Sequence, residues 1–178
     1  RAEVSDIANS IIDGTDALLV TGETAIGDYP EEVISVLSKV IEQTEKSISY
    51  NNKMIENDTV VSTAGAISHA ACTMAKDLNL KIIVTMTQSG GTARMVSSFR
   101  PSANIYAMTT MMETYRALSI IWGVIPILVD KYNSSDEIPD LAKKRLQEMN
   151  IIKDDEKFII TGGVPVNIPG TTNYISVL

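Results

Sequence analysis

The stretch KIIVTMTQSGGTARMVSSF, residues 81–99, contains the pattern that decides the fold. Its mostly apolar segment Lys81–Met86 predicts a strand, and its second half predicts a helix from about Thr92 to Phe99. Two adjacent glycines lie in the turn between the strand and the helix. A strand, a glycine-rich turn and a helix in succession indicate an α/β domain.

Segments of the same kind continue on both sides of this stretch. An alanine-rich helix is expected first, at about Thr59–Leu78, and further helices are expected between the later strands. Those strands are expected at Ile105–Met108, Val124–Val129, Phe158–Thr161 and Tyr174–Val177. Strands that alternate with helices predict a mostly parallel sheet with helices on both faces. The last two strands have no helix between them, so the final strand is expected to be antiparallel.

Three of the predicted helices begin with capping signals. Ser134 with Glu137, and Thr110 with Glu113, have the spacing of a capping box, in which the two side chains serve each other's free backbone N–H groups. Asp58 is a candidate N-cap of the alanine-rich helix. These signals predict where the three helices start.

The first fifty residues do not fit this domain. They predict a helix at residues 2–13, a short buried strand at Ala17–Val20, and a helix from Pro30 to about Ser47. One strand cannot form a sheet or close a barrel, so this segment is expected to be a single unit of a repeating α/β fold. Three parts are therefore expected: residues 1–50, a polar linker at 51–58, and the α/β domain at 59–178.

The composition excludes several classes of protein. The 178 residues have a net charge of −7, whereas a general nucleic-acid binder needs a basic surface to neutralise phosphates. The single cysteine excludes an internal disulfide and favours a reducing compartment. No apolar stretch approaches the ~20 residues of a membrane helix. A soluble intracellular protein is therefore expected, without nucleic-acid or membrane partners, and the initial Arg1 suggests a fragment or a processed chain.

The turn TQSGGTA, residues 87–93, is a candidate phosphate site. Its glycines let backbone N–H groups point outward, and the start of a helix adds roughly half a positive charge. Thr87, Ser89 and Thr92 add hydroxyl donors. The turn is neither a Walker loop nor a GxGxxG loop. On the pattern alone, an ordinary strand-to-helix turn capped by threonine remains an alternative.

A second loop, TGGVPVNIPGTTN, spans residues 161–173 between the last two strands and has three glycines and two prolines. It follows the C-terminal end of a strand, which is where ligands bind in open α/β sheets. Because the turn at 87–92 also follows a strand end, the two loops are expected to face one pocket. A rigid, extended hairpin loop is the alternative interpretation.

His69 and Cys72 lie on the alanine-rich helix. The chain has no second histidine or cysteine, so a metal site is not expected there. Cys72 is interpreted as a small core residue. The alanines around it indicate that this helix packs closely against another element.

Several motifs in series resemble those of pyruvate kinases. RAEVSDIAN at 1–9 and TGETAIGDYP at 21–30 resemble the end of the catalytic barrel of this family. The glycine turn, FRP at 99–101 and the second loop resemble landmarks of its C-terminal domain, so the resemblance covers essentially the whole chain. It implies that residues 1–50 are the last helix-strand-helix unit of a (β/α)8 barrel, and that residues 59–178 are the α/β effector domain.

The resemblance also implies a function. Pyruvate kinases convert phosphoenolpyruvate and ADP into pyruvate and ATP in glycolysis, using Mg²⁺ and K⁺, and the usual assembly is a homotetramer. The chain is therefore expected to be part of a cytoplasmic, homo-oligomeric phosphotransferase. A stand-alone, non-catalytic phosphate-ligand sensor and an oligomerisation module are the alternatives.

Two residues of the TGET motif correspond to family positions near the chemistry. Thr21 and Glu23 match a hydroxyl and an acid in the polar network linked to protonation of the enolate intermediate, where a supporting role is expected. The family's Mg²⁺ and K⁺ ligands and its phosphate-facing lysine lie on earlier barrel strands, and none is in this chain. We therefore predict no metal site and no activity of the chain alone. Without barrel partners, Ala17–Leu19 and the apolar stripe of residues 33–41 are expected to expose apolar surface that favours association.

For the glycine turn, the resemblance implies an effector site in which a phosphate is surrounded by Thr87, Gln88, Ser89, Gly90, Gly91 and Thr92. Gln88 and Gly91 stand where animal members often have basic residues. Gly163 and Val164 replace a Trp-Arg pair of some members, and Gly170 completes the possible second effector loop. The missing cations weaken the case for fructose 1,6-bisphosphate. AMP, ribose 5-phosphate and glucose 6-phosphate are expected to fit at least as well.

Overall fold

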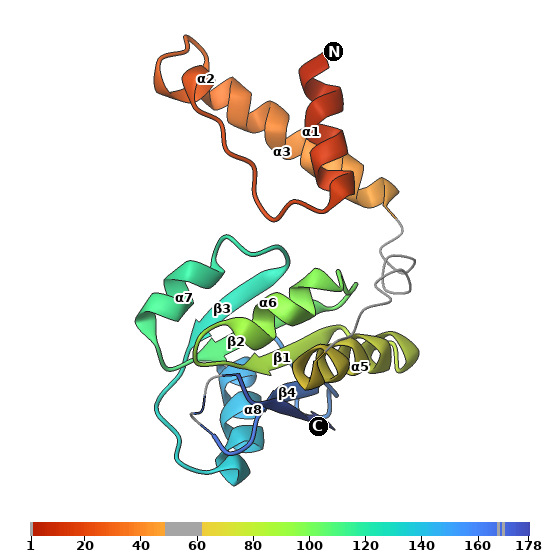
Figure 1. The fold of residues 1–178 in the computed structure, drawn as a ribbon, viewed down its shortest axis with the longest axis vertical. Helices are drawn as coiled ribbons and strands as arrows, with labels where there is room; N and C mark the ends of the chain where they lie inside the picture. Colours follow the sequence, from red (N-terminus) through yellow and green to blue (C-terminus); the bar gives the residue numbers. More distant parts are fainter. Residues whose placement is uncertain (1, 49–61, 167, 169) are drawn as a thin grey trace. The chain divides into compact units, whose positions relative to one another are not determined.

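The computed structural model describes residues 2–48, 62–166, 168 and 170–178. The chain divides into two compact units, Arg1–Ser49 and Tyr50–Leu178 (Figure 1). The expected linker at residues 51–58 lies outside the described residues. Within the described ranges, every helix is too short or too polar to span a membrane.

The larger unit is built on a five-stranded sheet with the order β3-β2-β1-β4-β5. Its strands are β1 (Ile82–Met86), β2 (Asn104–Thr109), β3 (Val124–Leu128), β4 (Ile159–Gly163) and β5 (Thr172–Val177). The first four pair in parallel, and β5 pairs antiparallel with β4. The predicted sheet, including its antiparallel last strand, is therefore confirmed.

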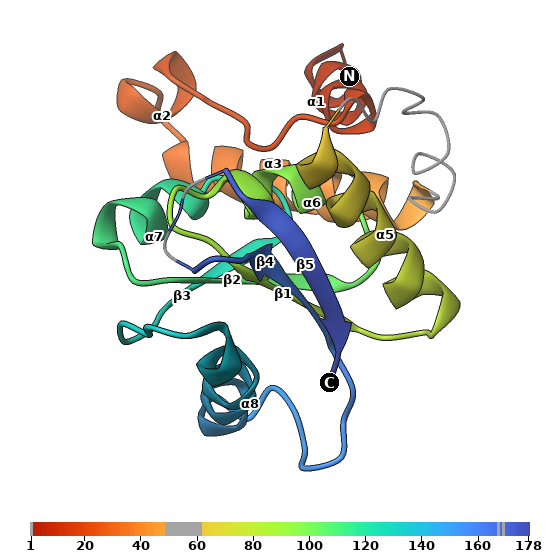
Figure 2. The ribbon, with the colours of Figure 1, turned by 60° about the horizontal axis from the view of Figure 1, so that its bottom comes forward.

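Helices cover both faces of this sheet, as Figure 2 shows. One face holds α5 (Thr63–Asp77), α6 (Gly91–Ser98) and α7 (Met112–Leu118), and the other holds α8 (Ile138–Glu148). Successive residues of a strand point to opposite faces, so each central strand supplies both cores. Ile83 packs on the α5–α6 side together with Cys72, whereas Val84 packs on the α8 side together with Leu146. This two-sided burial explains why every residue of β1 is buried and why most of them are apolar.

The order of the strands creates a switch point between β1 and β4. The chain moves from β1 to β2 and β3 toward one edge of the sheet, and then returns through α8 to pair β4 on the other side of β1. Helices of the outward and return connections lie on opposite faces, as the uniform handedness of such crossovers requires. The loops that follow β1 and β4 therefore diverge and leave a space between them.

The helix starts agree only partly with the predicted caps. Ser134 and Glu137 form the expected capping box, which begins the 3-10 turn Ser135–Glu137 that leads into α8. Thr110 does not cap α7, whose N-cap is Met111 without a side-chain bond. The Thr110 prediction fails because its hydroxyl instead donates to Oε1 of Gln88, at 3.0 Å.

The alanine-rich helix is capped by a residue that the sequence reading did not select. The side chain of Ser62 accepts a hydrogen bond from the N–H of Gly65, at 3.1 Å, and α5 starts at Thr63. The predicted cap, Asp58, lies outside the described residues. A serine three residues before the bonded N–H is the ordinary N-cap arrangement. The helix α5 therefore begins at Thr63, later than the expected start at about Thr59.

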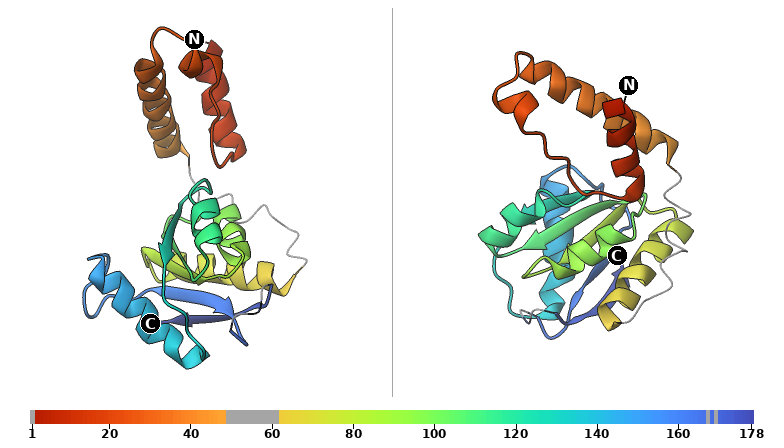
Figure 3. Two further views of the ribbon diagram at one scale, coloured as in Figure 1. Left: turned by 90° about the vertical axis from the view of Figure 1, so that its left-hand side faces the viewer. Right: turned by 45° about the horizontal axis from the view of Figure 1, so that its top comes forward.

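The described part of the smaller unit, residues 2–48, contains three helices, α1 (Ala2–Asp13), α2 (Gly22–Ala25) and α3 (Pro30–Ser47). Figure 3 shows α1 alongside α3, and the two helices are in contact. The predicted strand at Ala17–Val20 is wrong, since these residues have no regular structure. A strand requires a hydrogen-bonding neighbour, and the described part of this unit contains none.

Much of the apolar surface of the smaller unit is exposed, as expected. Leu37 is buried on α3, but Ile34 and Val36 of the predicted stripe are exposed. Leu19 and Ile26 are 87% and 89% exposed. A unit with so few buried side chains has little core of its own, so apolar association is expected to contribute to its stability.

Cys72 is a core residue, as predicted, and it gives a testable pH dependence. Burial raises the pKa of its thiol to about 12. The unfolded thiol has an ordinary pKa of ~8.5, so raising the pH above that value ionises the unfolded chain first and destabilises the fold up to about pH 12. We expect Cys72 to react slowly with a disulfide reagent at pH 8 in the native chain and rapidly in guanidinium. Equal rates in both conditions would contradict its burial.

Candidate functional site

The turn after β1 is folded back by one hydrogen bond. The hydroxyl of Thr87 accepts the N–H of Gly90 at 2.9 Å, inside the protein, and the N–H of Thr87 bonds to the carbonyl of Met108 at 3.0 Å. Gly90 has φ +84 and is the N-cap of α6. A side chain is disfavoured at such a φ, and a Cβ there would lie 3.1 Å from Cδ2 of Leu118. Gly90 therefore fits a backbone shape that other residues adopt poorly.

The residues at the start of α6, which follow this turn, line a pocket. The first backbone N–H that bonds back into the helix is that of Arg94, which reaches the carbonyl of Gly90 at 3.0 Å. The N–H groups of the first turn, Gly91–Ala93, precede it and have no carbonyl of their own helix to bond. They supply the partial positive charge of a helix N-terminus. Such an end is suited to bind an anion.

The second loop is held against this turn by side chains. The hydroxyls of Thr92 and Thr172 share a buried hydrogen bond of 2.6 Å, which joins α6 to the start of β5. The Asn173 amide bonds both the N–H and the carbonyl of Val164, at 2.9 and 2.7 Å. At Gly163 a Cβ would collide with the hydroxyl of Thr171. The loop base is therefore closed tightly beside the α6 N-terminus.

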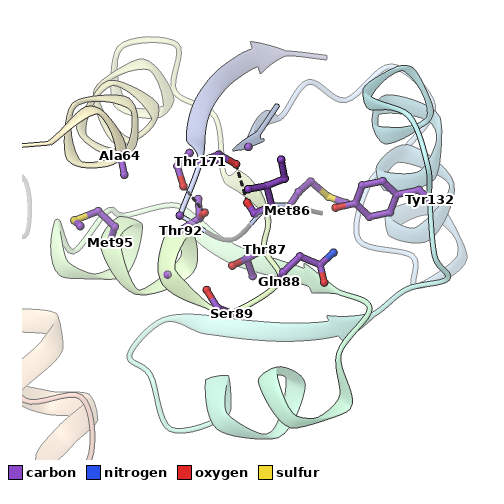
Figure 4. A pocket seen from close by; sticks show the side chains of 14 residues that line it. Ala64, Met86, Thr87, Gln88, Ser89, Thr92, Met95, Tyr132 and Thr171 are labelled. Atoms are coloured by element: carbon purple, nitrogen blue, oxygen red, sulfur yellow. Dashed lines mark hydrogen bonds between the residues drawn. The ribbon is translucent and has the colours of Figure 1, made fainter. Parts of the chain in front are cut away.

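The two loops line one pocket, as expected from the strand ends. Its volume of about 150 Å³ is roughly ten times the ~15 Å³ that one water needs, so it admits a phosphate group. Figure 4 shows Thr87 and Thr92 near the middle of this pocket, with Ala64 and Met95 on one side and Tyr132 on the other. The lining residues are Ala64, Met86, Thr87, Gln88, Ser89, Gly91, Thr92, Met95, Tyr132, Gly163, Ile168, Gly170, Thr171 and Thr172.

Most of the predicted effector residues lie in this lining, but two do not. Gly90 is outside the lining and is the N-cap of α6. Val164 is also outside the lining, and its backbone N–H donates to the side chain of Asn173. Sequence reasoning missed Tyr132, which lies in the segment that follows β3. Its position after a predicted strand could have identified it, because the residues that follow parallel strands lie at the same edge of the sheet. Thr171 and Thr172 also line the pocket. They were not predicted individually, although they lie in the loop at residues 161–173 that was predicted to face the pocket.

The pocket has an uncharged lining. None of its described lining residues is Asp, Glu, Lys, Arg or His. The polar groups of the lining are the first N–H groups of α6, the Gln88 amide and the hydroxyls of Thr87, Ser89, Thr92, Tyr132, Thr171 and Thr172. A negative ligand would therefore be bound by neutral donors and by the helix dipole, without an ion pair from this lining.

Gln88 is fixed by neighbours from two other segments. Thr110 donates to its side-chain oxygen at 3.0 Å, and Thr114 on α7 donates to its backbone carbonyl at 2.6 Å. Burial raises the pKa of the Tyr132 hydroxyl, and a hydrogen bond with the Gln88 side chain opposes that rise. The Gln88 amide is thus positioned between the β2–α7 turn and Tyr132.

The TGET residues belong to the smaller unit. Thr21 precedes the single turn α2, which contains Glu23, and both side chains are exposed. In residues 2–48, 62–166, 168 and 170–178, no group of three His, Cys, Asp or Glu side chains could hold a metal ion. The described residues therefore do not fit the Mg²⁺ site of the family. His69 packs edge-on against Phe99, with ring centroids 5.3 Å apart.

A mostly parallel sheet covered on both faces defines the larger unit as an α/β domain, and the pocket outside the carboxyl ends of β1 and β4 is its candidate small-ligand site. Comparison with known proteins supports the fold class. Residues 65–178 match the family model of the pyruvate kinase α/β domain, and residues 1–34 match that of the pyruvate kinase barrel domain. The chain belongs to the pyruvate kinase family.

Its relatives include complete enzymes. The chain is 40% identical to pyruvate kinase of Clostridium acetobutylicum over 179 residues and 44% identical to that of Thermotoga maritima over 178 residues. These alignments include 99% and 100% of the chain, and the chain spans 38% of the length of each relative.

Solved structures show the same likeness. A crystal structure of a pyruvate kinase from Cryptosporidium parvum matches with a TM-score of 0.84 at 31% identity, covering 100% of this chain and 36% of that one. A structure of the Cryptosporidium parvum enzyme in complex with ADP matches with a TM-score of 0.78 at 34% identity, with the same coverage.

Proposed function

We propose that the chain is the C-terminal part of a cytoplasmic pyruvate kinase, which transfers a phosphoryl group from phosphoenolpyruvate to ADP. The family membership and the matches to both of its domain models support this. Mg²⁺ and K⁺ would be bound by other parts of the whole enzyme, because the described residues lack a suitable ligand group. Homotetramer formation is part of the proposal, and the exposed apolar side chains of the smaller unit suit association.

Within that enzyme, we propose that the larger unit binds a phosphorylated small-molecule effector. The observation that supports this best is the pocket at the switch point, where the α6 N-terminus and a set of hydroxyls face one space. Helix N-termini and concave arrays of N–H groups bind phosphate in many α/β proteins. Thr87, Ser89 and Thr92 would surround the phosphate, and the loop after β4 would cover it.

The uncharged lining favours a monophosphate over a bisphosphate. A second phosphate would lose its hydration and would meet none of the cations that usually bind such a group, at least among the described lining residues. A sugar monophosphate or AMP carries only the charge that the α6 N-terminus can stabilise. We therefore place fructose 1,6-bisphosphate below these ligands in expected affinity.

Calorimetric titration of the chain tests the effector proposal directly. We expect ribose 5-phosphate, glucose 6-phosphate or AMP to bind, and Ser89→Ala to weaken binding about tenfold, because hydrogen bonds to charged groups are worth ~1.5–3 kcal/mol. Ser98→Ala is the matched control, since Ser98 lies at the far end of α6 and bonds only within that helix. No binding heat from any of these ligands or from fructose 1,6-bisphosphate would end the proposal for this chain.

A further inference from the structure

Tyr132 is the pocket residue whose presence the glycine turn does not explain. It reaches the pocket from the segment after β3, which is two strands away from β1 in the sheet. Its ring packs in the α8-side core, beside Met86, and the residue is 5% exposed. A phenylalanine would fill the same core volume, so packing alone does not require the hydroxyl.

The Tyr132 hydroxyl lies on the wall opposite Ala64 and Met95, and the Gln88 side chain extends toward it (Figure 4). Gln88 is itself held by Thr110, so the amide is presented in one orientation. A phenol both donates and accepts, and an amide does the same with two separate atoms. This pair can therefore donate a hydrogen bond to a ligand hydroxyl or accept one from it, while the two side chains remain bonded to each other.

The burial of the Tyr132 ring restricts the kind of ligand. A nucleobase gains much of its affinity by stacking on an exposed aromatic face. Tyr132 is the one aromatic residue of the described lining, and at 5% exposure it offers no open ring face for stacking. Ala64, Met86, Met95 and Ile168 supply the apolar part of the lining, and its polar part consists of hydroxyls, backbone and the Gln88 amide. These polar groups suit the hydroxyls of a sugar.

We infer that Tyr132, together with Gln88, forms the specificity subsite of the pocket, which selects a sugar monophosphate by bonding a hydroxyl of its sugar. This inference rests on the proposed effector function. The α6 N-terminus binds the phosphate, which inorganic phosphate and all phosphate monoesters share. The Tyr132–Gln88 pair then distinguishes these ligands by the part that they do not share.

Titration with four probes tests the inference. In the wild-type chain, ribose 5-phosphate and glucose 6-phosphate are expected to bind more tightly than inorganic phosphate and AMP. Tyr132→Phe is expected to weaken the two sugar phosphates about threefold to tenfold, the effect of one hydrogen bond, and to leave inorganic phosphate unchanged. Tyr106→Phe is the matched control, because Tyr106 is a buried tyrosine of β2 on the same core face and does not line the pocket.

The outcomes separate the inference from the function on which it rests. If wild-type chain binds none of the probes, the effector function fails, and the inference fails with it. If the sugar phosphates bind but Tyr132→Phe changes them no more than inorganic phosphate, the effector function stands and Tyr132 is only a structural residue. AMP binding more tightly than both sugar phosphates would overturn the assignment to a sugar.

Discussion

No pyruvate is expected to form when the 178-residue chain is given phosphoenolpyruvate, ADP, Mg²⁺ and K⁺. Phosphoryl transfer depends on metal ions and cations that neutralise the charge of the moving group and hold the two substrates in line. The described residues contain no cluster of three His, Cys, Asp or Glu side chains that could hold a metal ion. Thr21 and Glu23 are exposed, so neither has the water-excluded environment in which catalytic electrostatics are strong.

A coupled assay for pyruvate checks this result at high protein concentration. The enzyme of Thermotoga maritima, which is 44% identical to the chain and much longer, serves as the positive control in the same buffer. The effect should be complete, since removing even single charge-stabilising groups from an active site costs factors of ~100–1,000 in rate. Turnover that disappears in the Glu23→Gln variant would show that the chain itself is active and would refute the prediction.

Replacing Gly90 by valine is expected to reduce effector binding about 100-fold and to destabilise the larger unit by ~2 kcal/mol. Gly90 has φ +84, a conformation that a β-branched residue adopts only with strain, and the new Cβ would lie 3.1 Å from Leu118. Relief of that strain would move the turn. The N–H groups of α6 would then no longer point together at the phosphate, and several charge-assisted hydrogen bonds would weaken at once.

Gly123→Val separates the loss of stability from the loss of binding. Gly123 also has a positive φ, +67, and a Cβ there has its nearest neighbour 3.9 Å away at Ile105. It lies before β3 and does not line the pocket. Denaturant unfolding should show a similar loss of stability in both variants, whereas titration should show weaker binding only for Gly90→Val. Unchanged affinity in Gly90→Val would refute the role of this turn in ligand binding.

The fold of the larger unit was predictable because its signals are local. Residues 82–86 are mostly apolar and do not alternate with charged residues, and such a strand is covered on both faces. The glycine turn was recognisable for the same reason, since a backbone with positive φ selects glycine whatever lies around it. The capping boxes show the limit of local signals. Ser134 caps as predicted, whereas the hydroxyl of Thr110 is used by Gln88, which lies 22 residues away in the sequence.

The sequence by itself determined the elements of the larger unit, the two loops at its strand ends and, through its motifs, the family. Only the tertiary structure decided that β4 pairs beside β1, that Tyr132 lies beside Gln88 in the pocket lining, and that residues 17–20 form no strand. The physical reason is the same in each case. Apolar period and turn chemistry act over a few residues, whereas strand order, a shared pocket wall and strand formation each depend on a partner that is distant in the chain or absent from its unit.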